Sequence, residues 1–321
     1  MKLSFPSGLA TSLPKSIFRI FFPLLLISGN VFSQTTYYID AVSGNDANNG
    51  RSESSAWKTV SKVGNHNGFA SGDIVSLKRG QTHFGRLIPP VNGLTFNSYG
   101  SGNLPEITGA IEQNSWTDIG GGVFETSIGV APKIIMINGR KYSKGRYPDN
   151  GWLNIDNTSG GNITSSGLSG RNFTGGKAVI RKNRWIIDND SISSQSGSTI
   201  NFTYKFYAPK QNFKFFITDH LSCLNTYGEW YYDHAARKLR VFFGGSGPAA
   251  VKASVLDNVV SIRGISNTTF RDISFSFANQ ELVYLSSTNN TRFSNCTFEY
   301  GYNAMGFWTG SNTNANISNC L

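Results

Sequence analysis

The chain has 321 residues, of which 39% are hydrophobic and only 15% charged, with 35 glycines and a formal net charge of +10. This length suits one large domain or two smaller ones. The scarcity of charged residues argues against a helical bundle, whose exposed faces need many Glu and Lys residues, and it favours a β structure rich in turns.

The first 33 residues have the pattern of a secretory signal peptide. Lys15 and Arg19 precede an apolar run from Ile20 to Ile27, and "VFS" before Gln34 supplies a cleavage site. The run is too short to span a membrane, and no second run of spanning length follows. We therefore expect a secreted protein, either extracellular, periplasmic or at the cell surface, with no membrane span.

Loss of residues 1–33 leaves a net charge of +7, because that segment holds three basic residues and no acidic ones. A basic exported protein suggests acidic partners such as uronate-containing or sulfated polysaccharides, although charge that serves only solubility explains the excess equally well. Export makes nucleic acid a poor partner. We expect a monomer.

Residues 34–110 alternate between strand and turn patterns. Tyr37 to Val42 predicts a strand, "SGNDANNG" a turn, and Trp57 to Val63 a short helix or helical turn. "GDIVSLKRGQTHFG" then predicts strand, turn and strand. The oxygen donors of "GNDANNG" lack the spacing and the closing Glu of an EF-hand, so we interpret them as a turn and not as a metal site.

The C-terminal residues 251–321 contain a repeat, in "TFRDISF", "TRFSNCTF" and "NISNCL", which aligns on Asp272, Asn295 and Asn319 at spacings of 23 and 24 residues. Apolar residues lie two before, one after and three after each of these positions, as far as the chain extends. A flat strand would need steps of two throughout, so the extra residue indicates a corner. Asp and Asn suit a corner because they tolerate a left-handed backbone.

A period in the low twenties predicts stacked coils that bury a shared core. Strand, corner and strand in each coil indicate a parallel β-helix, in which Phe270, Phe293 and Ile317 stack in one column and the Asp/Asn positions form a side-chain ladder. Leu321 falls within a predicted strand with no cap after it, so we expect this chain to be a fragment of a longer protein with more coils.

The cysteines Cys223, Cys296 and Cys320 do not form a disulfide framework. Cys296 and Cys320 occupy equivalent positions in neighbouring coils, so a disulfide is geometrically feasible. We favour buried free thiols that act as small hydrophobes.

The N-terminal motifs "YYID", "GNDANNG", "AWKTV", "GDIVSLKRG" and "SYGSGNLPEITG" occur in an order that resembles secreted right-handed parallel β-helix proteins of the pectate-lyase-like superfamily. The segments "SWTDIGGGVFETSI", "MINGRKYSKGRYPDNGW" and "YGEWYYDHAARKLRVFF" resemble a β-rich subdomain inserted in some carbohydrate-active members. The resemblance implies an all-β fold, with an N-terminal cap and first coils in 34–110, an inserted subdomain in 111–250 and further coils in 251–321. It also implies a glycoside hydrolase or a polysaccharide lyase. The alternative is a non-catalytic glycan-binding or adhesin-like protein, since a fold does not determine a function.

Glycoside hydrolysis needs two carboxylates roughly 5–10 Å apart, which neighbouring coils could supply. The residue equivalent to Glu281 one coil later is Ala304, and the residue equivalent to Glu299 one coil earlier is Ser276. The sequence therefore predicts no stacked pair. Glu299 is the best single catalytic candidate, with Tyr302 and Trp308 as candidate substrate-binding residues, although a solvated turn acid is the commoner role for such a residue.

The predicted hairpin of Glu229 to Asp233, a turn, and Lys238 to Phe243 offers two further candidate acids, Glu229 and Asp233. They could bracket an aromatic sugar platform, or they could cap the hairpin while its aromatic residues enter a core. Arg146 of "GRYPDN" could contact substrate, or it could hold the inserted segment in place.

The sequence indicates no cofactor and no metal-ligand set. A lyase would need a cation or a basic group to neutralise a uronate, so Ca²⁺ is expected only if the protein is a lyase. Asp272 could serve as a calcium ligand, but its place in the corner column favours a structural role.

Overall fold

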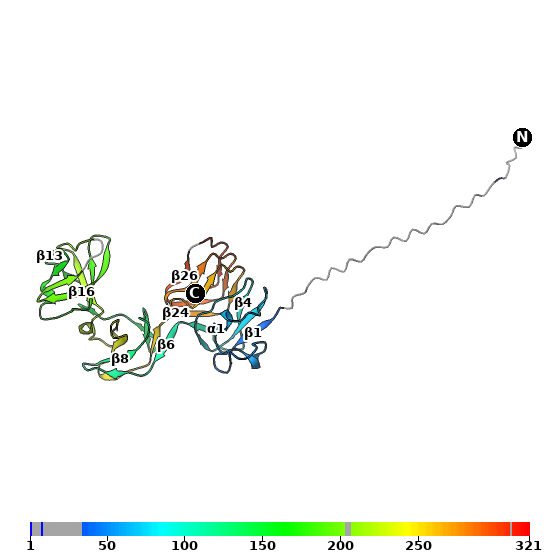
Figure 1. The fold of residues 1–321 in the computed structure, drawn as a ribbon, viewed down its shortest axis with the longest axis horizontal. Coiled ribbons are helices and arrows are strands. Elements are labelled where there is room, and N and C mark those ends of the chain that lie inside the picture. Colours follow the sequence, from blue (N-terminus) through cyan, green and yellow to red (C-terminus); the bar gives the residue numbers. More distant parts are fainter. Residues whose placement is uncertain (2–7, 9–33, 203–206, 309) are drawn as a thin grey trace. The chain divides into compact units, whose positions relative to one another are not determined.

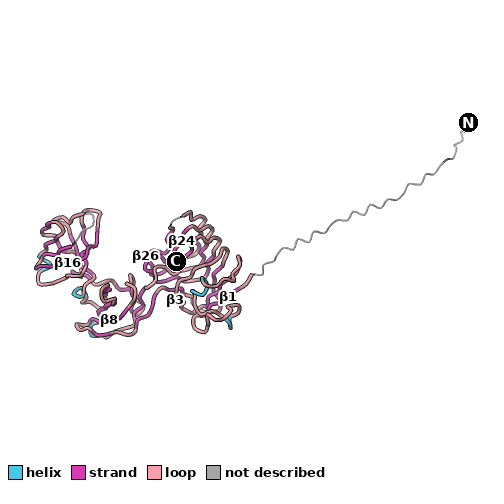
Figure 2. The backbone as a smooth tube through the Cα atoms, viewed as in Figure 1, coloured by secondary structure: helices cyan, strands magenta, loops and turns pink. Residues whose placement is uncertain are grey.

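The structure is a computed structural model that describes residues 1, 8, 34–202, 207–308 and 310–321. The predicted signal peptide and its cleavage site lie outside the described residues, apart from Met1, Gly8 and Gln34. The chain from Gln34 to Leu321 forms one unit by its internal contacts. Strands make up most of its regular structure, and the helices are short (Figure 2).

Two stacks of parallel strands build the main body (Figure 1). The first runs in the order β1 (Thr36–Ile39), β2 (Ile74–Lys78), β4 (Thr95–Tyr99), β23 (Thr269–Arg271), β25 (Arg292–Ser294) and β27 (Asn316–Ser318). The second contains β3 (Thr82–Phe84), β5 (Glu106–Thr108), β22 (Val260–Arg263), β24 (Ser274–Ser286) and β26 (Thr297–Phe307). Every pairing within them is parallel and joins strands of successive coils, so the predicted all-β parallel β-helix is confirmed.

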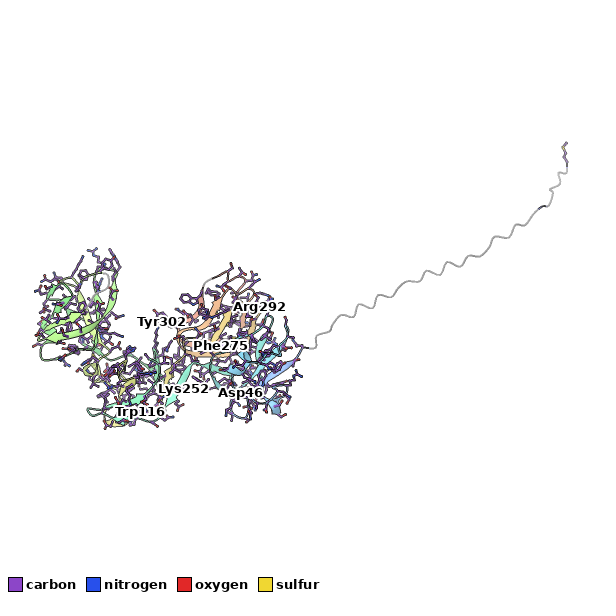
Figure 3. The ribbon with its side chains drawn as sticks, viewed as in Figure 1. Asp46, Trp116, Lys252, Phe275, Arg292 and Tyr302 are labelled. Carbon is purple, nitrogen blue, oxygen red and sulfur yellow. The ribbon has the colours of Figure 1, made fainter. Side chains whose placement is uncertain are left out.

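The register of the coils matches the predicted repeat. Phe270 pairs with Phe293, and Phe293 pairs with Ile317. The rings of Phe96, Phe270 and Phe293 stack at centroid distances of 4.8 and 4.9 Å inside the coils. Phe275 packs edge-on against this column from the second stack (Figure 3). A continuous aromatic core therefore runs along the helix axis.

The predicted corners are also present. Asp272, Asn295 and Asn319 have φ values of 58°, 53° and 52°, in the left-handed region. The Asn295 side-chain amide donates to Asp272 Oδ1 at 3.3 Å, which is one rung of the predicted ladder. A second column lies beside it, where Asn290 donates to Asn267 Oδ1 at 2.8 Å.

A long segment interrupts the β-helix between β5 and β22. It leaves the coils through β6 (Ala110–Gln113) and returns through β21 (Val251–Ser254), and these two strands pair antiparallel. β9 (Ile135–Ile137) and β10 (Arg140–Tyr142) complete their sheet. A neighbouring sheet has the order β19 (Trp230–Asp233), β20 (Lys238–Phe242), β8 (Val123–Ser127) and β7 (Thr117–Asp118), which confirms the predicted hairpin.

The rest of this segment forms a third body of antiparallel strands around its own core of apolar residues, among them Ile180, Phe215 and Ile217. Its strands are β11 (Arg146–Tyr147), β12 (Leu153–Asn154), β13 (Asn157–Ser159), β14 (Asn162–Thr164), β15 (Lys177–Arg181), β16 (Ile187–Ser196), β17 (Thr199–Phe202) and β18 (Lys214–Thr218). The short helices are η1 (Glu53–Ser55), α1 (Ser61–Gly64), η2 (Ser166–Leu168), η3 (Leu221–Cys223) and η4 (Gly244–Ser246).

Two N-terminal elements are shorter than the sequence predicts. The strand predicted to reach Val42 ends at Ile39, because the Asp40 carboxylate accepts hydrogen bonds from the backbone N–H groups of Val42 and Ser43 and turns the chain. The helix predicted from Trp57 begins only at Ser61. Trp57 instead continues the ladder, because it pairs with Ile39.

The interpretation of "GNDANNG" as a turn is confirmed. Asp46 accepts hydrogen bonds from the backbone N–H groups of Lys58 and Thr59 at 2.8 and 2.9 Å, which ties the turn to the next segment (Figure 3). All three cysteines are free thiols. Cys296 is buried, as favoured above, whereas Cys320 is only partly buried, and Cys223 is buried as well. Among the described residues, no helix has both the length and the apolar character needed to cross a membrane.

Candidate functional site

Strand β24 contributes to two different faces of the β-helix. Its first residues, Ser274–Ser276, pair with β5, and its last four, beginning with Val283, pair with β22. Phe277 has a φ of 55° between them, and Tyr300 has a φ of 58° at the matching place in β26. Both strands therefore turn a corner here, and side chains before and after it point away from the helix in different directions.

Glu281 lies just after this corner, and 3% of its surface is exposed. Its Oε2 atom is buried and has no hydrogen-bond partner. A buried carboxylate oxygen without a protein partner costs free energy, so it needs an explanation such as a bound water, an ion, a ligand or a catalytic role. Among the described carboxylates of the β-helix, Glu281 alone has such an oxygen, so it is the acid there that we select as a candidate site residue.

The space for Glu281 comes from Gly306 on the next coil. A Cβ atom at Gly306 would lie 2.5 Å from Glu281 Cγ and 2.5 Å from the indole nitrogen of Trp308. The carboxylate side chain therefore passes directly over the glycine and reaches the edge of the Trp308 ring.

Two aromatic rings and one basic side chain lie on the same side of the β-helix as this carboxylate. The rings of Tyr284 and Trp308 stack with centroids 6.1 Å apart and planes at 11°, and Trp308 is 48% exposed. The Arg263 guanidinium lies 4.2 Å from the Tyr284 ring centroid. We call Arg263, Glu281, Tyr284, Gly306 and Trp308 the Glu281 face.

Tyr302 lies on β26, the strand that also carries Gly306. It precedes Asn303, the register partner of Glu281, and is 75% exposed (Figure 3). Lys133 Nζ lies 5.4 Å from the Tyr302 ring centroid, and the Lys133 backbone N–H donates to Asn279 Oδ1 at 2.9 Å. The interrupting segment thus places a cation next to Tyr302 of β26.

Glu299 lies on the other side of the corner. It is exposed and pairs with Ser276, while Glu281 pairs with Asn303. The sequence alignment placed Ala304 opposite Glu281, which is wrong by one residue because a register shift lies between Ala278 and Glu281. The structure thus separates Glu299 from the Glu281 face, whereas it brings Trp308 into that face.

A second acid, not singled out from the sequence, shares the face of Glu299. Glu106 Oε1 accepts a hydrogen bond from Ser276 Oγ at 2.5 Å, and its Oε2 accepts one from Thr82 Oγ1 at 3.0 Å. Both carboxylate oxygens of Glu106 are satisfied by the protein itself, unlike Oε2 of Glu281.

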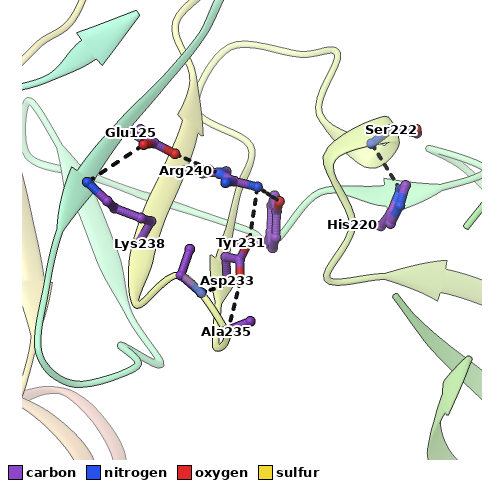
Figure 4. Close-up of polar contacts among 9 residues, drawn as sticks. Glu125, His220, Ser222, Tyr231, Asp233, Ala235, Lys238 and Arg240 are labelled. Carbon is purple, nitrogen blue, oxygen red and sulfur yellow. Dashed lines mark hydrogen bonds and ion pairs between the residues drawn. The ribbon is translucent and has the colours of Figure 1, made fainter. Parts of the chain in front are cut away.

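Glu229 and Asp233 lie at opposite ends of β19. Glu229 Oε2 accepts from the backbone N–H groups of Asn225 and Thr226, each at 2.9 Å. Asp233 Oδ1 accepts from the N–H groups of the turn residues Ala235 and Ala236 (Figure 4). Both acids therefore cap turns, and Trp230 between them is buried.

Asp233 also belongs to a network of charged residues on this hairpin (Figure 4). Arg240 donates to Asp233 Oδ2 and Glu125 Oε2, each at 3.0 Å, and to the Tyr231 hydroxyl at 2.5 Å. Burial raises the pKa of Tyr231 despite the contact with Arg240.

A cavity of about 440 Å³ lies between this hairpin and the ends of β15 and β18. Asp219 lies in its wall and forms ion pairs with Lys144 at 2.6 Å and Lys177 at 2.9 Å. Burial raises the pKa of Asp219, but the two lysines outweigh this effect and hold it below its ordinary value. Burial lowers the pKa of His220, whose Nδ1 accepts from the Ser222 backbone N–H at 3.1 Å.

Arg146 is occupied by the segment around it. Its Nε donates to the Pro148 carbonyl at 3.0 Å, its guanidinium also contacts the Gly151 carbonyl, and its Cζ lies 3.9 Å from the Phe216 ring centroid. These contacts hold the start of the third body together. Across the described ranges, no three His, Cys, Asp or Glu side chains gather in a cluster able to hold a metal ion.

No protein-family profile matches this sequence, and no curated protein matches it. Among solved structures, one named "Glycoside hydrolase" aligns with a TM-score of 0.67 and 14% identity over 83% of this chain. The two proteins share a fold. The chain spans 62% of the length of that structure, and at this level of identity the likeness shows the fold alone.

Two other solved structures align with lower TM-scores. XylC in complex with xylose has a TM-score of 0.45 and 13% identity, over 84% of this chain and 42% of its own. The GH136 lacto-N-biosidase from Eubacterium ramulus has a TM-score of 0.39 and 12% identity, over 89% of this chain and 34% of its own.

Proposed function

We propose that this protein acts on carbohydrate and that the Glu281 face is the surface that holds the sugar. The observation that carries the proposal is the unpartnered Oε2 of Glu281 beside the stacked rings of Tyr284 and Trp308. Sugars have apolar C–H faces that pack on aromatic rings and hydroxyl groups that donate to carboxylates. A bound sugar would cover the exposed part of Trp308, and it would satisfy the buried oxygen once a side-chain movement opens Oε2 to the ligand.

The reaction class that we favour is hydrolysis of a glycosidic bond, with Glu281 holding or moving the proton. The likeness to a structure named as a glycoside hydrolase supports this class. The outward positions beside Glu281, namely Ser261, Arg263, Tyr284, Ser286 and Gly306, include no second carboxylate. The second acid must then come from another part of the protein.

Two alternatives remain open to experiment. A polysaccharide lyase would leave an unsaturated uronate that absorbs in the ultraviolet, and its activity could depend on Ca²⁺. A non-catalytic glycan-binding protein would bind without cleaving. Acidic glycans are the first substrates to try, since the chain is basic.

The decisive experiment compares Glu281→Gln and Trp308→Ala with the parent protein and with Glu53→Gln, a control that removes an exposed acid in η1. Isothermal titration and tryptophan fluorescence would measure binding to a panel of neutral and acidic oligosaccharides. We expect each face variant to weaken binding by roughly tenfold, the effect of about 1.4 kcal/mol, while the control binds normally.

Thermal unfolding separates this role from a structural one. A carboxylate kept for a ligand is a stability cost, so Glu281→Gln should unfold at the same temperature as the parent or higher. Lower stability with unchanged binding would reject the proposed site.

The reaction class follows from the products. New reducing ends would indicate a hydrolase, ultraviolet-absorbing products a lyase, and neither a binding protein; each assay is run with and without a calcium chelator. Glu299→Gln, Glu229→Gln and Asp233→Asn test the remaining acids.

We also propose that the protein is exported and acts as a monomer. The signal-peptide pattern of residues 1–33 supports export. Mass spectrometry of protein expressed with its leader should find Gln34 as the first residue, and light scattering should give the mass of one chain. Protein that stays in the cell pellet with residues 1–33 still attached would contradict export.

A further inference from the structure

Trp185 is 82% exposed, the largest exposed fraction of any tryptophan in the described ranges. It lies in the turn between β15 and β16, which is closed by a hydrogen bond from Lys182 N–H to the Ile186 carbonyl at 3.0 Å. Asn183 Oδ1 accepts from the backbone N–H groups of Trp185 and Ile186 at 3.0 and 2.8 Å. The tip of the hairpin therefore has a defined shape that holds Trp185 in solvent.

The base of this turn is anchored in the interior of the third body. Lys182 is buried, and its Nζ forms ion pairs with Asp190 at 2.8 Å and Asp188 at 3.1 Å. Truncating one member of such a buried group is destabilising, so Lys182 fixes the base of the turn to β16. Trp185 is thus exposed at the tip of a hairpin whose base is fixed by the ion pairs of Lys182.

Strand alternation sorts the charges near Trp185. Asp188 and Asp190 point toward the interior with Ile192, so Ile187 and Asn189 point outward. On the paired strands the outward positions are Lys177, Val179 and Arg181 in β15, and Lys214, Phe216 and Thr218 in β18. The outward positions of these strands carry basic residues and no carboxylate, although Lys177 at one end is paired with Asp219 just beyond β18.

A cavity of about 430 Å³ opens on this face. Its walls are Trp152, Arg181, Arg184, Trp185, Ile187 and Lys214. Its size lies in the range of small-molecule sites, roughly 300–1,000 Å³. Three cations and two indole rings therefore surround one hollow, which we call the Trp185 site.

We propose that the Trp185 site binds an anionic polysaccharide, in addition to the sugar held at the Glu281 face. Indole rings offer flat surfaces for sugar rings, and Arg side chains pair with carboxylate or sulfate groups through two parallel hydrogen bonds. The absence of acidic residues among the six that form its walls matches a negatively charged ligand. A neutral glycan would offer no negative charge to pair with these three cations.

The test uses the whole mature chain and polygalacturonate, chondroitin sulfate and neutral dextran as probes. Affinity electrophoresis and titration calorimetry would compare the parent with Trp185→Ala, Trp185→Phe and Arg184→Gln. Arg51→Gln is the matched control, because it removes an exposed positive charge from the N-terminal region. Far-UV circular dichroism would check folding, which these exposed positions should not affect.

We expect the parent to bind at least one anionic polysaccharide, more weakly at higher salt, and not to bind dextran at this site. Trp185→Ala should weaken this binding about tenfold, Trp185→Phe less, and Arg184→Gln severalfold with a shallower salt dependence, while Arg51→Gln binds normally. Equal binding by Trp185→Ala and the parent would overturn the proposal. So would binding to vesicles of phosphatidylcholine and phosphatidylglycerol without binding to either anionic polysaccharide, which would make this a membrane surface.

The two proposed sites can fail separately. Glu281→Gln tests the Glu281 face and leaves the Trp185 site intact, whereas Trp185→Ala does the reverse. Binding lost only in Trp185→Ala would support the Trp185 site even if the Glu281 face proves to have no ligand.

Discussion

Gly306 lies directly beneath the side chain of Glu281, and a Cβ atom at Gly306 would come within 2.5 Å of Glu281 Cγ. The backbone of Gly306 does not have a positive φ, so conformational freedom is not the reason for a glycine here. The position is glycine because the carboxylate needs the space above it. Replacement of Gly306 is therefore a way to disturb Glu281 without changing its chemistry.

Gly306→Ala should displace the Glu281 carboxylate and the Trp308 ring edge, and should weaken carbohydrate binding at this face by roughly tenfold, or about 1.4 kcal/mol. Calorimetric titration with the best oligosaccharide from the panel would measure the loss. Gly245→Ala is the control, since nothing lies within 4 Å of its added methyl group. Full affinity in Gly306→Ala would show that the position of Glu281 is irrelevant to binding.

Asn295→Ala should destabilise the β-helix by about 2 kcal/mol, because alanine resists the left-handed backbone and cannot form the ladder bond to Asp272. Asn295→Gly should cost less, because glycine accepts the backbone and loses only the hydrogen bond. Urea unfolding of both variants gives the difference. Equal losses in the two variants would mean that backbone strain does not contribute.

Stability should fall below about pH 4 through Asp219, whose folded-state pKa is depressed by Lys144 and Lys177 in spite of its burial. A carboxylate with a depressed pKa contributes stability above its unfolded-state pKa, near 3.9, and loses it as the pH falls toward the folded-state value. Asp219→Asn should be less stable at pH 7 and should show a smaller drop in melting temperature between pH 5 and pH 3. Because Asp219 has a φ of 55°, asparagine keeps the backbone and isolates the charge. Parallel pH profiles for the parent and the variant would contradict this assignment.

Two of the three thiols should be inert in the native protein. Burial raises the pKa of Cys223 and of Cys296 to about 12, so almost no thiolate exists at pH 8. Cys320 is only partly buried, and it should react first with Ellman's reagent. Mass spectrometry after brief labelling would identify the modified residue, and denatured protein would give the full count. Fast, equal modification of all three in native conditions would show that the cores open readily.

The repeat was predictable because each coil repeats the same requirement, an apolar column beside a residue that accepts a left-handed turn. The residue types at Asp272, Asn295 and Asn319 predict that turn, because Asp and Asn tolerate a left-handed backbone. The corner at Phe277 and Tyr300 has the same backbone but no such signal, because aromatic residues rarely adopt it. It was therefore missed, and with it the register shift that places Glu281 opposite Asn303.

The candidate site was harder to predict than the fold for the same reason. Trp308 was singled out as an aromatic residue near an acid, but the acid beside it is Glu281 and not Glu299. One feature of the sequence could have identified Glu281, because this carboxylate directly precedes the apolar run "LVYL". The turn-capping roles of Glu229 and Asp233 match one of the two alternatives that the hairpin pattern offers, but only the structure identifies the backbone N–H groups that each acid accepts from.

The pairing of Ala110 with Ser254 means that the interrupting segment starts and ends at adjacent points of the β-helix. For the coils, the interrupting segment of some 140 residues therefore has the geometry of a hairpin, and the entropy of closing a loop grows only slowly with its length, by about 0.6 kcal/mol per doubling. A gene could gain, lose or exchange this segment without changing the register of β5 with β24. The Trp185 site lies wholly within this segment, so the ligand preference of that site can change in evolution without a change in what the coils bind.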